Sequence, residues 1–454
     1  MAISLSNITF TDEDDIVPPS GAEPIIVGFF STVNTLAGDD IINGGNDTTD
    51  INFGAFYNNL STLNTNSGND LITGIYHGSG HGIVNTGSPN PDEKGFATIN
   101  TGDGNDTITG ISDNVFSHGR GIYNVLGFID TGDGNDIITG IGGEYGIFTE
   151  IATIDTGNGD DIITAISEGT GIDSRINTTI NTGGGNDIIT ATSDYGFGIL
   201  LLDGTINTGE GNDIITGTGG GTYGLVFSTY GGSGSRVHTG EGDDIITGTG
   251  GEYGILSQYI DTGEGDDIIT GTGGEYTIFT SYGISGSIDT GNGDDIITGT
   301  GREYGIIGSI DTGNGDDIIT GTGGKYGISG SIDTGNGDDT ITSIGAIYNE
   351  GVIETGNGTD SIIADGGFEG IGYVSLGEDE DYLKGSGSGE FSGGSGNDTL
   401  ELTSGTYTVG RWYTAVTLTK GSSVMIASEF EKLIAGSTLY DFTSLTQGQT
   451  ITVA

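Results

Sequence analysis

The chain has 454 residues, of which 64 are acidic and 10 basic, giving a formal net charge of −54. This charge repels phosphate and excludes nucleic acid as a partner of the main body, whereas cations are its natural counterpart. Glycine supplies 93 residues and hydrophobic residues only 32%, which argues against two or three ordinary globular domains. Cysteine is absent, so disulfides and thiolate metal sites are excluded as well.

Residues 1–33 stand apart from the repetitive sequence that follows them. They include the string ITFTDEDDIVPP and the apolar run 25–30, and we expect them to form an N-terminal cap or arm. They lack the basic start and apolar run of a cleaved signal peptide. No stretch of about 18 apolar residues occurs in the sequence, so no membrane span is expected.

A nine-residue phrase recurs through residues 34–398. The copy at 312–320 reads TGNGDDIIT, and there are about 15 recognisable copies. Successive copies are 21 or 22 residues apart between Asp295 and Asp381, and insertions lengthen the spacing nearer the N-terminus. A unit this short cannot bury its apolar side alone and has to stack on its neighbours. We therefore expect an all-β fold, a parallel β-roll or β-solenoid of about 15 coils, mostly of 21–30 residues, with strands ~4.8 Å apart.

Each repeat divides into an acidic turn, a strand, a second turn and a returning strand. Residues 318–322 are rich in β-branched side chains and predict the first strand. If Ile319 points inward, then Ile318, Thr320 and Thr322 point outward, because side chains alternate along a strand. The repeat thus predicts a flat outer face built of Ile-x-Thr-x-Thr columns. A tyrosine in the second turn of several copies predicts an aromatic ladder, made of Tyr145, Tyr223, Tyr253, Tyr276, Tyr304 and Tyr326.

Residues 399–454 also lack the phrase. They contain the one tryptophan of the chain, several Thr-rich β segments and the apolar ending 449–454. The end of a solenoid exposes unpaired strand edges, which have to be covered. We therefore expect these residues to form a C-terminal β cap.

The sixth residue of the phrase is Asp in every copy. Glycines at the second and fourth positions allow backbone conformations that other residues avoid, so the turn carbonyls can converge on one spot. Carboxylate and carbonyl oxygens are the hard ligands that calcium prefers. Asp40 and Asp381 lie in copies with missing glycines, and we do not include them among the predicted ligands. The predicted calcium ligands are Asp70, Asp106, Asp136, Asp161, Asp187, Asp213, Asp244, Asp267, Asp295, Asp317, Asp339, Asp360 and Asp398.

Electrostatic repulsion also indicates a bound cation. Two like charges ~4.8 Å apart repel by about 3.5 kcal/mol at an effective dielectric constant of about 20. Over the stacked turns this sum exceeds the net stability of a domain, roughly 5–15 kcal/mol. We therefore predict about one Ca²⁺ ion between each pair of adjacent turns.

The phrase resembles the nonapeptide Gly-Gly-x-Gly-x-Asp-x-apolar-x of the RTX (repeats-in-toxin) proteins. Residues 393–401 match it at every position, while most other copies have Thr in place of the first Gly. The resemblance covers residues 35–401 and implies calcium between turns and a β-roll that folds only with calcium. RTX coils typically carry two nonapeptides, whereas these coils carry one, which suggests a single row of calcium ions.

The resemblance also implies a route out of the cell. Residues 399–454 are similar to the C-terminal segments of cyanobacterial RTX exoproteins. They would then hold an uncleaved signal that a type I exporter reads, in addition to the cap. This implies an extracellular or cell-surface location without a cleaved N-terminal signal peptide.

Function has to be inferred apart from the scaffold. The sequence has no Ser-His-Asp pattern and no HExxH motif, and its carboxylates are periodic rather than local, so we expect no enzyme activity. The leading hypothesis is self-association of the Ile/Thr face into an extracellular fibril or surface layer. An ice-binding solenoid is the alternative, because paired Thr residues recur in six successive coils, from Thr190/Thr192 to Thr320/Thr322. An adhesin is a further alternative, and the simplest interpretation is that the face is merely β-forming and solvated.

Overall fold

The computed structural model describes residues 2–17, 23–46, 54–78, 80–90, 95–113, 118–228, 234–274 and 280–454. Its regular secondary structure in these ranges consists of strands joined by turns, apart from two short 3-10 helices, η1 (Leu5–Asn7) and η2 (Phe442–Ser444). Strands pair in parallel with the equivalent strand of the next coil, which confirms the predicted all-β solenoid. Within the described ranges, no helix has the length and apolarity that crossing a bilayer needs.

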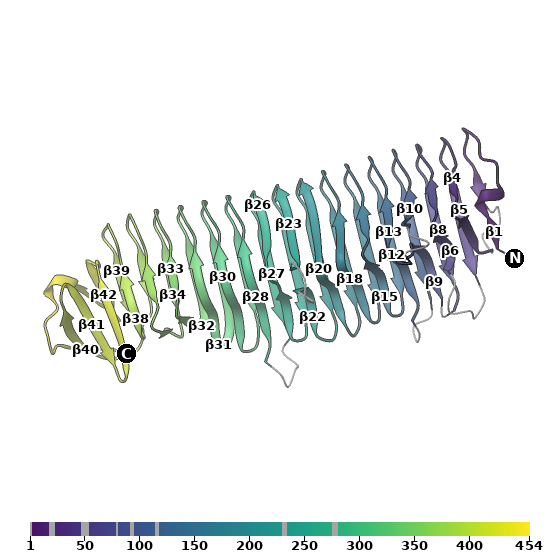
Figure 1. Cartoon of the computed structure of the whole chain (residues 1–454). Coiled ribbons are helices and arrows are strands. Elements are labelled where there is room, and N and C mark those ends of the chain that lie inside the picture. Colours follow the sequence, from purple (N-terminus) through teal and green to yellow (C-terminus); the bar gives the residue numbers. More distant parts are fainter. Residues whose placement is uncertain are drawn as a thin grey trace. The chain divides into compact units, whose positions relative to one another are not determined.

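The chain divides into two compact units. Unit one comprises Met1–Gly251 and Leu256–Gln258, and unit two comprises Glu252–Ile255 and Tyr259–Ala454. Strand β25 (Tyr253–Leu256) lies at this division. In each unit, equivalent strands of successive coils lie side by side (Figure 1).

Each coil contributes three strand segments, which we call a, b and c. In the coil formed by β31 (Ile318–Asp333) these are residues 318–322, 326–329 and 331–333. Segment a supplies Ile319 to the core, segment b supplies Ile328 and segment c supplies Ile332, and each is at most 2% exposed. The core of a coil is therefore a small cluster of branched aliphatic side chains, extended by stacking on the next coil.

In unit one, the strands form three parallel columns. Column a consists of β2 (Ile16–Val17), β5 (Ile41–Asn46), β8 (Leu71–Tyr76), β11 (Thr107–Ser112), β14 (Ile137–Gly142), β17 (Ile162–Ser167), β19 (Ile188–Ser193), β21 (Ile214–Gly219) and β24 (Ile245–Gly250). Column b consists of β1 (Ile3–Ser4), β3 (Ile25–Phe29), β6 (Gly54–Asn59), β9 (His81–Thr86), β12 (Arg120–Val125), β15 (Tyr145–Glu150) and β22 (Tyr223–Ser228). Column c consists of β4 (Thr32–Asn34), β7 (Thr62–Asn64), β10 (Ala97–Asn100), β13 (Gly127–Asp130), β16 (Thr153–Asp155) and β23 (Arg236–Glu241), and β18 (Thr170–Asn181) and β20 (Phe197–Glu210) span both b and c.

Unit two continues the same pattern and ends differently. Columns a, b and c contain β26 (Ile260–Glu264), β27 (Ile268–Gly273), β28 (Tyr282–Asp289), β29 (Ile296–Thr300), β30 (Tyr304–Asp311), β31, β32 (Thr340–Asn349), β33 (Val352–Glu354), β34 (Ser361–Ala364), β35 (Phe368–Gly370), β36 (Tyr373–Ser375), β37 (Tyr382–Lys384), β38 (Gly389–Ser392) and β39 (Thr399–Leu402). The C-terminal segment contains β40 (Gly405–Trp412), β41 (Ala415–Lys420), β42 (Ser423–Ser428), β43 (Lys432–Ala435), β44 (Thr438–Asp441) and β45 (Thr450–Val453). Of these, β42 and β43 pair in parallel with β38 and β39, and β40, β41, β44 and β45 pair antiparallel around them.

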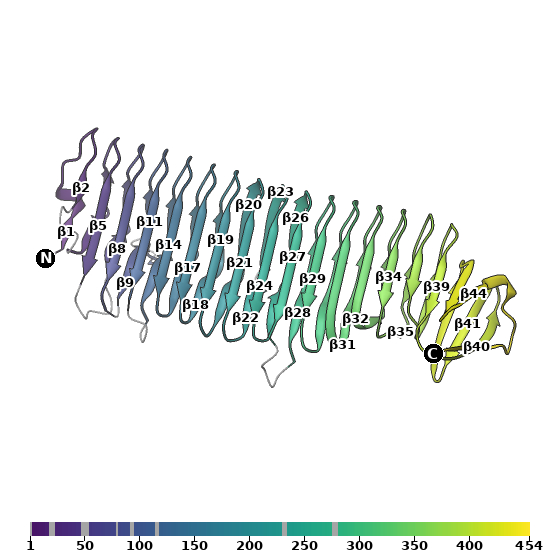
Figure 2. The ribbon, with the colours of Figure 1, turned by 180° about the vertical axis from the view of Figure 1, so that it is seen from behind.

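The a strands present the outer face that the alternation predicts (Figure 2). Ile319 is fully buried, whereas its neighbour Ile318 is 43% exposed. Pairing is in register, so Thr190 lies beside Thr216 and Thr192 beside Thr218. The outer face therefore consists of straight columns of identical or similar side chains, one strand spacing apart.

The returning strand has a corner that the sequence did not reveal. In unit two a glycine makes the bend between segments b and c, for example Gly330 with φ 144°. In unit one the same place is taken by residues such as Leu126 and Ile151, both with φ 50°. Such backbone is rare for a β-branched residue, so this corner could not be inferred from turn-forming residues.

An aromatic ladder is present, with partly different members from those expected. In unit two Tyr253, Tyr282 and Tyr304 stack at 4.4 and 5.0 Å between ring centroids. The ladder continues through Tyr326 to Tyr348. The expected member Tyr276 lies outside the described residues, and Tyr282 occupies the ladder. In unit one, Tyr223 stacks on Phe197, and Tyr145 contacts Phe148 of its own strand.

Candidate metal centre

The invariant Asp residues form one continuous hydrogen-bonded row in each unit, which we call the Asp ladder. Within a unit, the backbone amide of each of these Asp residues except the last donates to Oδ1 of the equivalent Asp in the next coil. In unit one this links Asp40 to Asp70 at 2.8 Å and continues to Asp244, and in unit two it runs from Asp267 to Asp398. All the predicted ligands therefore lie in the ladder, and so do Asp40 and Asp381, which the missing glycines had set aside.

The ladder carboxylates are buried, with no more than 2% of any of these residues exposed. Oδ1 accepts the amide hydrogen bond, but Oδ2 of most of them has no hydrogen-bond partner among the described residues. A buried ionised carboxylate without compensation is costly. Oδ2 is in this state in Asp40, Asp70, Asp106, Asp136, Asp161, Asp187, Asp213, Asp295, Asp317, Asp360, Asp381 and Asp398.

The preceding residue of the turn provides an internal comparison. Its side chain also accepts a coil-to-coil hydrogen bond, from the amide of the equivalent residue in the next coil. Asn135 accepts one in this way from Asp160, at 3.1 Å, and Asp294 accepts one from Asp316, at 2.8 Å. Asn and Asp alternate freely at this exposed position, because either offers one oxygen. The buried ladder position is always Asp, although an Asn oxygen would accept the amide equally well, so it is the second oxygen that this position requires.

A threonine lies beside most of the ladder carboxylates, at the first position of the phrase. These threonines are fully buried, and in most coils their hydroxyl donates to a carbonyl of the next coil, as Thr101 does to Thr131 at 3.3 Å. Thr334 instead donates to Oδ2 of Asp339, at 2.5 Å. In these coils the hydroxyl lies close enough to favour the ionised carboxylate, but it donates to the carbonyl and so compensates the second carboxylate oxygen only in part.

The two glycines of the turn are required by its close stacking. Gly313 and Gly315 have φ of 79° and 144°, in the region that favours glycine. A Cβ atom on either one would collide with the carbonyl oxygen of Gly291 or Gly293 in the preceding coil. Glycine thus brings successive turns, with their carbonyls and carboxylates, into direct contact.

Burial raises the pKa of the ladder carboxyls well above its ordinary value. The pKa rises to about 7 for Asp106, Asp161 and Asp295 and to about 6 for Asp136 and Asp317. The nearby Thr hydroxyl and the amide of the preceding Asp favour the charged form and offset part of this rise. Neighbouring ladder carboxylates add to it by repulsion. The ionised state of the Asp ladder is therefore unfavourable unless a cation compensates its charge.

The structure adds ladder members that the repeat did not identify. The amide of Asp15 donates to Oδ1 of Asp40 at 2.8 Å, and Asp14 accepts from Asp39 at 3.0 Å. Residues 10–17 are therefore a further, degenerate copy of the turn, whose glycines are replaced by Thr11 and Glu13. At the other end, Glu431 Oε2 accepts the amide of Asp398 at 2.8 Å. Both were missed because neither has glycine at the expected spacing.

The chemistry of the ladder fits a hard divalent cation held partly by backbone. In the described part of the chain, no group of three or more His, Cys, Asp or Glu side chains is arranged to hold a metal ion. A cation at the ladder would need the orphaned Oδ2 atoms together with the turn carbonyls. Calcium accepts this combination, since it takes six to eight oxygen ligands from carboxylates and carbonyls.

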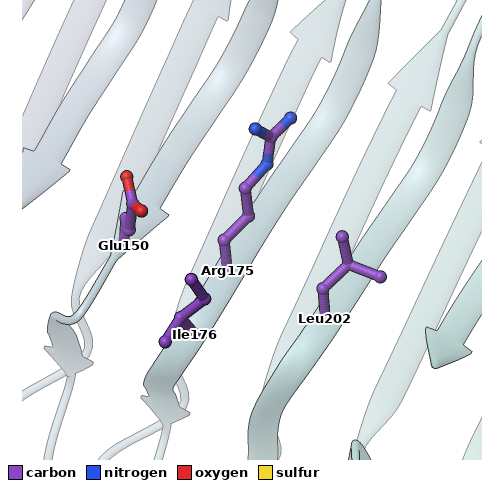
Figure 3. A pocket seen from close by; sticks show the side chains of 4 residues that line it. All are labelled: Glu150, Arg175, Ile176 and Leu202. Carbon is purple, nitrogen blue, oxygen red and sulfur yellow. The ribbon is translucent and has the colours of Figure 1, made fainter. Parts of the chain in front are cut away.

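A hollow of about 450 Å³ lies on the b side of unit one, away from the ladder. It is lined by Glu150, Arg175, Ile176 and Leu202, which come from three successive coils (Figure 3). The Arg175 guanidinium donates to both carboxylate oxygens of the buried Asp173, at 2.7 and 2.6 Å. Its charge is thereby neutralised within the coil, so the hollow offers no free cation to an anionic ligand.

No family model and no curated protein match this chain. One solved structure, described as a hyperactive, Ca²⁺-dependent, β-helical antifreeze protein from an Antarctic bacterium, aligns with 97% of this chain and 93% of its own. The sequence identity is 15% and the TM-score is 0.28. At these values the likeness carries no argument about this chain, whose fold and candidate site rest on its own geometry.

Proposed function

We propose that this protein is an extracellular, calcium-stabilised structural solenoid of the RTX kind. The observation that carries the proposal is the row of buried Asp carboxylates, most of which have a second oxygen without a hydrogen-bond partner among the described residues. Calcium bound at these oxygens would remove the charge repulsion along the ladder. Outside the cell calcium is abundant enough for sites with dissociation constants of about 10⁻⁴–10⁻³ M.

The proposal implies a change of state during export. In the low calcium of the cytosol the chain remains unfolded, because the folded ladder would hold uncompensated charges. A type I exporter, reading residues 399–454, passes the unfolded chain, and calcium then folds it outside. Metal binding of this kind supplies folding free energy directly.

Calcium titration of the full chain tests this function. The far-ultraviolet circular dichroism of the chelated protein is expected to lack β structure and to gain it cooperatively as free Ca²⁺ rises. Mg²⁺ at the same concentration is expected to be much less effective, because it demands a stricter octahedral geometry. Full β structure in excess chelator at pH 8 would refute the proposal.

We further propose that the outer a face binds a second copy of the same chain. From β5 to β24 none of its outward residues is charged, although the chain carries −54. Several of its isoleucines are well exposed, for example Ile137 at 39% and Ile166 at 44%. Two copies repel one another through most of their acidic surface but can meet through this face.

The area of the face suits a stable contact. Each a strand is about 20 Å long, and eight strands ~4.8 Å apart span ~38 Å within unit one. The product, about 750 Å², is close to the ~800 Å² that each partner contributes to a standard interface. Association through this face would give the fibril or surface layer that the sequence suggested.

A charged substitution tests the assembly. Thr164→Lys places a charge in the middle of strand β17 on the a face of unit one, and Thr179→Lys places the same charge on the c segment of β18 as a control. Electron microscopy and sedimentation at millimolar Ca²⁺ are expected to show assemblies of the wild type and of the control but not of Thr164→Lys. Monomeric wild-type protein under these conditions would rule assembly out.

Ice binding is the second candidate for the same face. It is favoured by the in-register Thr pairs, such as Thr298 and Thr300 beside Thr320 and Thr322. Isoleucines interrupt this pattern in other coils, including Ile344 beside Thr322. Thermal hysteresis in the folded, calcium-loaded monomer, abolished by Thr298→Lys, would favour ice over self-association, and its absence would remove this candidate.

A further inference from the structure

The last turn of the Asp ladder differs from all the others. Residues 393–398 form the glycine-rich turn between β38 and β39. In the next coil, the equivalent strands β42 and β43 are joined by residues 429–431 alone. Three residues thus replace six, and the sequence Glu-Phe-Glu replaces the glycines and the Asp.

Glu431 occupies the place of the next ladder Asp. Its Oε2 accepts the amide of Asp398 at 2.8 Å, as an Asp Oδ1 does elsewhere. In return, the amides of Glu431 and Lys432 donate to the carbonyl of Asp398, at 3.2 and 3.0 Å. The longer side chain of Glu431 therefore continues the ladder across a turn that is too short to carry an Asp to the same point.

The same turn brings a carbonyl oxygen close to the buried carboxylate. Gly393 stands where most copies have a buried Thr and one has Leu376. A Cβ atom on Gly393 would collide with the carbonyl oxygen of Glu429 and would lie 2.9 Å from both Cβ and Oδ2 of Asp398, so the turn is closely packed here. Asp398 is fully buried, and this Oδ2 has no hydrogen-bond partner among the described residues. The orphaned carboxylate oxygen and the Glu429 carbonyl oxygen therefore both lie beside Gly393, where no side chain separates them.

We infer that a divalent cation, calcium, binds between these two oxygens and joins the C-terminal segment to the solenoid. Its ligands are Oδ2 of Asp398 and the carbonyl of Glu429, with the carboxylate of Glu431 contributing the second charge. The inference rests on the proposed calcium-dependent fold and adds two residues outside the repeat to it. Asp398 belongs to the last repeat and Glu429 and Glu431 to the C-terminal segment, so this ion would hold the two together.

The site makes docking of the cap a calcium-dependent step. Strands β42 and β43 carry the antiparallel strands β41 and β44, so the whole C-terminal segment is attached through the two strands that flank this turn. Without the ion, the carboxylates of Asp398 and Glu431 repel each other at the junction, and the nearby Lys432 offsets this repulsion only in part. Loss of the ion would therefore loosen the C-terminal segment before the coils that precede it.

Glu431→Gln tests the site in the full-length protein. The amide oxygen of Gln can still accept the Asp398 hydrogen bond, so the variant removes a charge while keeping the turn. Glu390→Gln is the matched control, because Glu390 is an exposed acid on β38 that has no part in the turn. Gly393→Ala is a second test, since its methyl group would push the Glu429 carbonyl away from Asp398 without removing any charge.

The measurement is amide hydrogen exchange of β42 and β43 as free Ca²⁺ is raised, with β29 and β31 as the reference. Glu431→Gln and Gly393→Ala are expected to need about tenfold more calcium to protect β42 and β43, with the reference strands unchanged. Glu390→Gln is expected to match the wild type. If the calcium concentration that protects β42 and β43 shifts equally in Glu431→Gln and Glu390→Gln, or in neither, this inference alone is overturned. If the reference strands never respond to calcium, the proposed function is overturned as well.

Discussion

At the scale of single residues, two adjacent positions of the acidic turn have different roles. The side chains of Asp316 and its equivalents are exposed and accept one hydrogen bond, as Asp316 does from the amide of Asp338, a role that Asn fills in other coils. Asp317 and most of its equivalents are buried and offer a second oxygen that has no hydrogen-bond partner among the described residues. The two positions therefore accept the same kind of hydrogen bond, but only the buried position requires the charge of a second carboxylate oxygen.

Substitution of these two neighbours separates the roles. Asp317→Asn is expected to keep the ladder hydrogen bond but to lower the number of bound Ca²⁺ ions by about one and to raise the calcium midpoint of folding. Asp316→Asn removes the same charge and is expected to leave both quantities close to those of the wild type. Native mass spectrometry counts the ions, and circular dichroism gives the midpoint. Equal effects of the two changes would show that only the overall charge matters.

The raised pKa values predict how the calcium-free protein responds to pH. The pKa of Asp106, Asp213 and Asp339 is about 7 in the fold, against an ordinary value of 3.8. A group whose pKa is raised by folding favours the folded state fully below its unfolded pKa and loses this contribution as pH rises through its folded pKa. In excess chelator, β structure is therefore expected to be more stable near pH 4 than at pH 8, as measured by thermal melting.

Calcium should reverse this dependence. The ion binds the ionised carboxylates, so acid competes with it and binding releases protons. With millimolar calcium, the melting temperature is expected to rise between pH 5 and pH 8. If the calcium-free protein were instead most stable at pH 8, the ladder carboxyls would not be the groups that control folding.

At the scale of the elements, some glycines of the turn cannot be replaced by another residue, whereas others can. Gly183 has φ 94°, and a Cβ there would collide with the carbonyl of Gly157. The next residue, Gly184, has its nearest atom at 3.5 Å from such a Cβ. These two adjacent glycines therefore differ in whether a residue with a Cβ atom can replace them.

This pair gives a prediction about stability. Gly183→Ala is expected to lower the free energy of unfolding by at least about 1–3 kcal/mol, the cost of a strained backbone, before the collision is counted. Gly184→Ala is expected to be neutral or slightly stabilising, because it restricts the unfolded chain. Denaturant unfolding at saturating calcium measures both. Similar losses in the two variants would contradict the close stacking of the turns.

The period of the repeat was enough to predict the parallel strand columns. The features that were not predicted lie where the sequence departs from the repeat. The alternation of side chains correctly predicted that Ile319 points inward and Ile318 outward, because a shift of one residue would exchange the two faces. The corner at Ile151 was not foreseen, since a β-branched residue there adopts a backbone that its type disfavours. Asp15 and Glu431 were missed because their turns lack glycine, so only the hydrogen bonds of the folded chain reveal them.

At the scale of the whole molecule, the large negative charge has two parts that respond differently to salt. Exposed acids repel through solvent, where the screening length falls from about 10 Å at 0.1 M to about 3 Å at 1 M ionic strength. The ladder carboxylates are buried and are screened much less. The charge of −54 therefore cannot be neutralised by monovalent salt alone.

Salt should consequently replace calcium only in part. In chelator at pH 8, 1 M NaCl is expected to recover a fraction of the β signal that millimolar CaCl₂ restores. Circular dichroism at matched ionic strength makes the comparison. Full recovery in NaCl would mean that screening of the surface, and not occupation of the ladder, allows folding.

The in-register pairing of coils has a consequence for how such a chain can change in length. Ile296 pairs with Ile318, and each strand of one coil meets its equivalent in the next. Removing residues 296–317, which is 22 residues, would join Asp295 directly to Ile318 and leave every remaining pair matched. The shortened protein is expected to fold at nearly the same calcium concentration and to bind about one ion fewer. A deletion one residue shorter would exchange the inward and outward side chains, and the resulting protein is expected not to fold. The number of coils can therefore vary by recombination only in whole units.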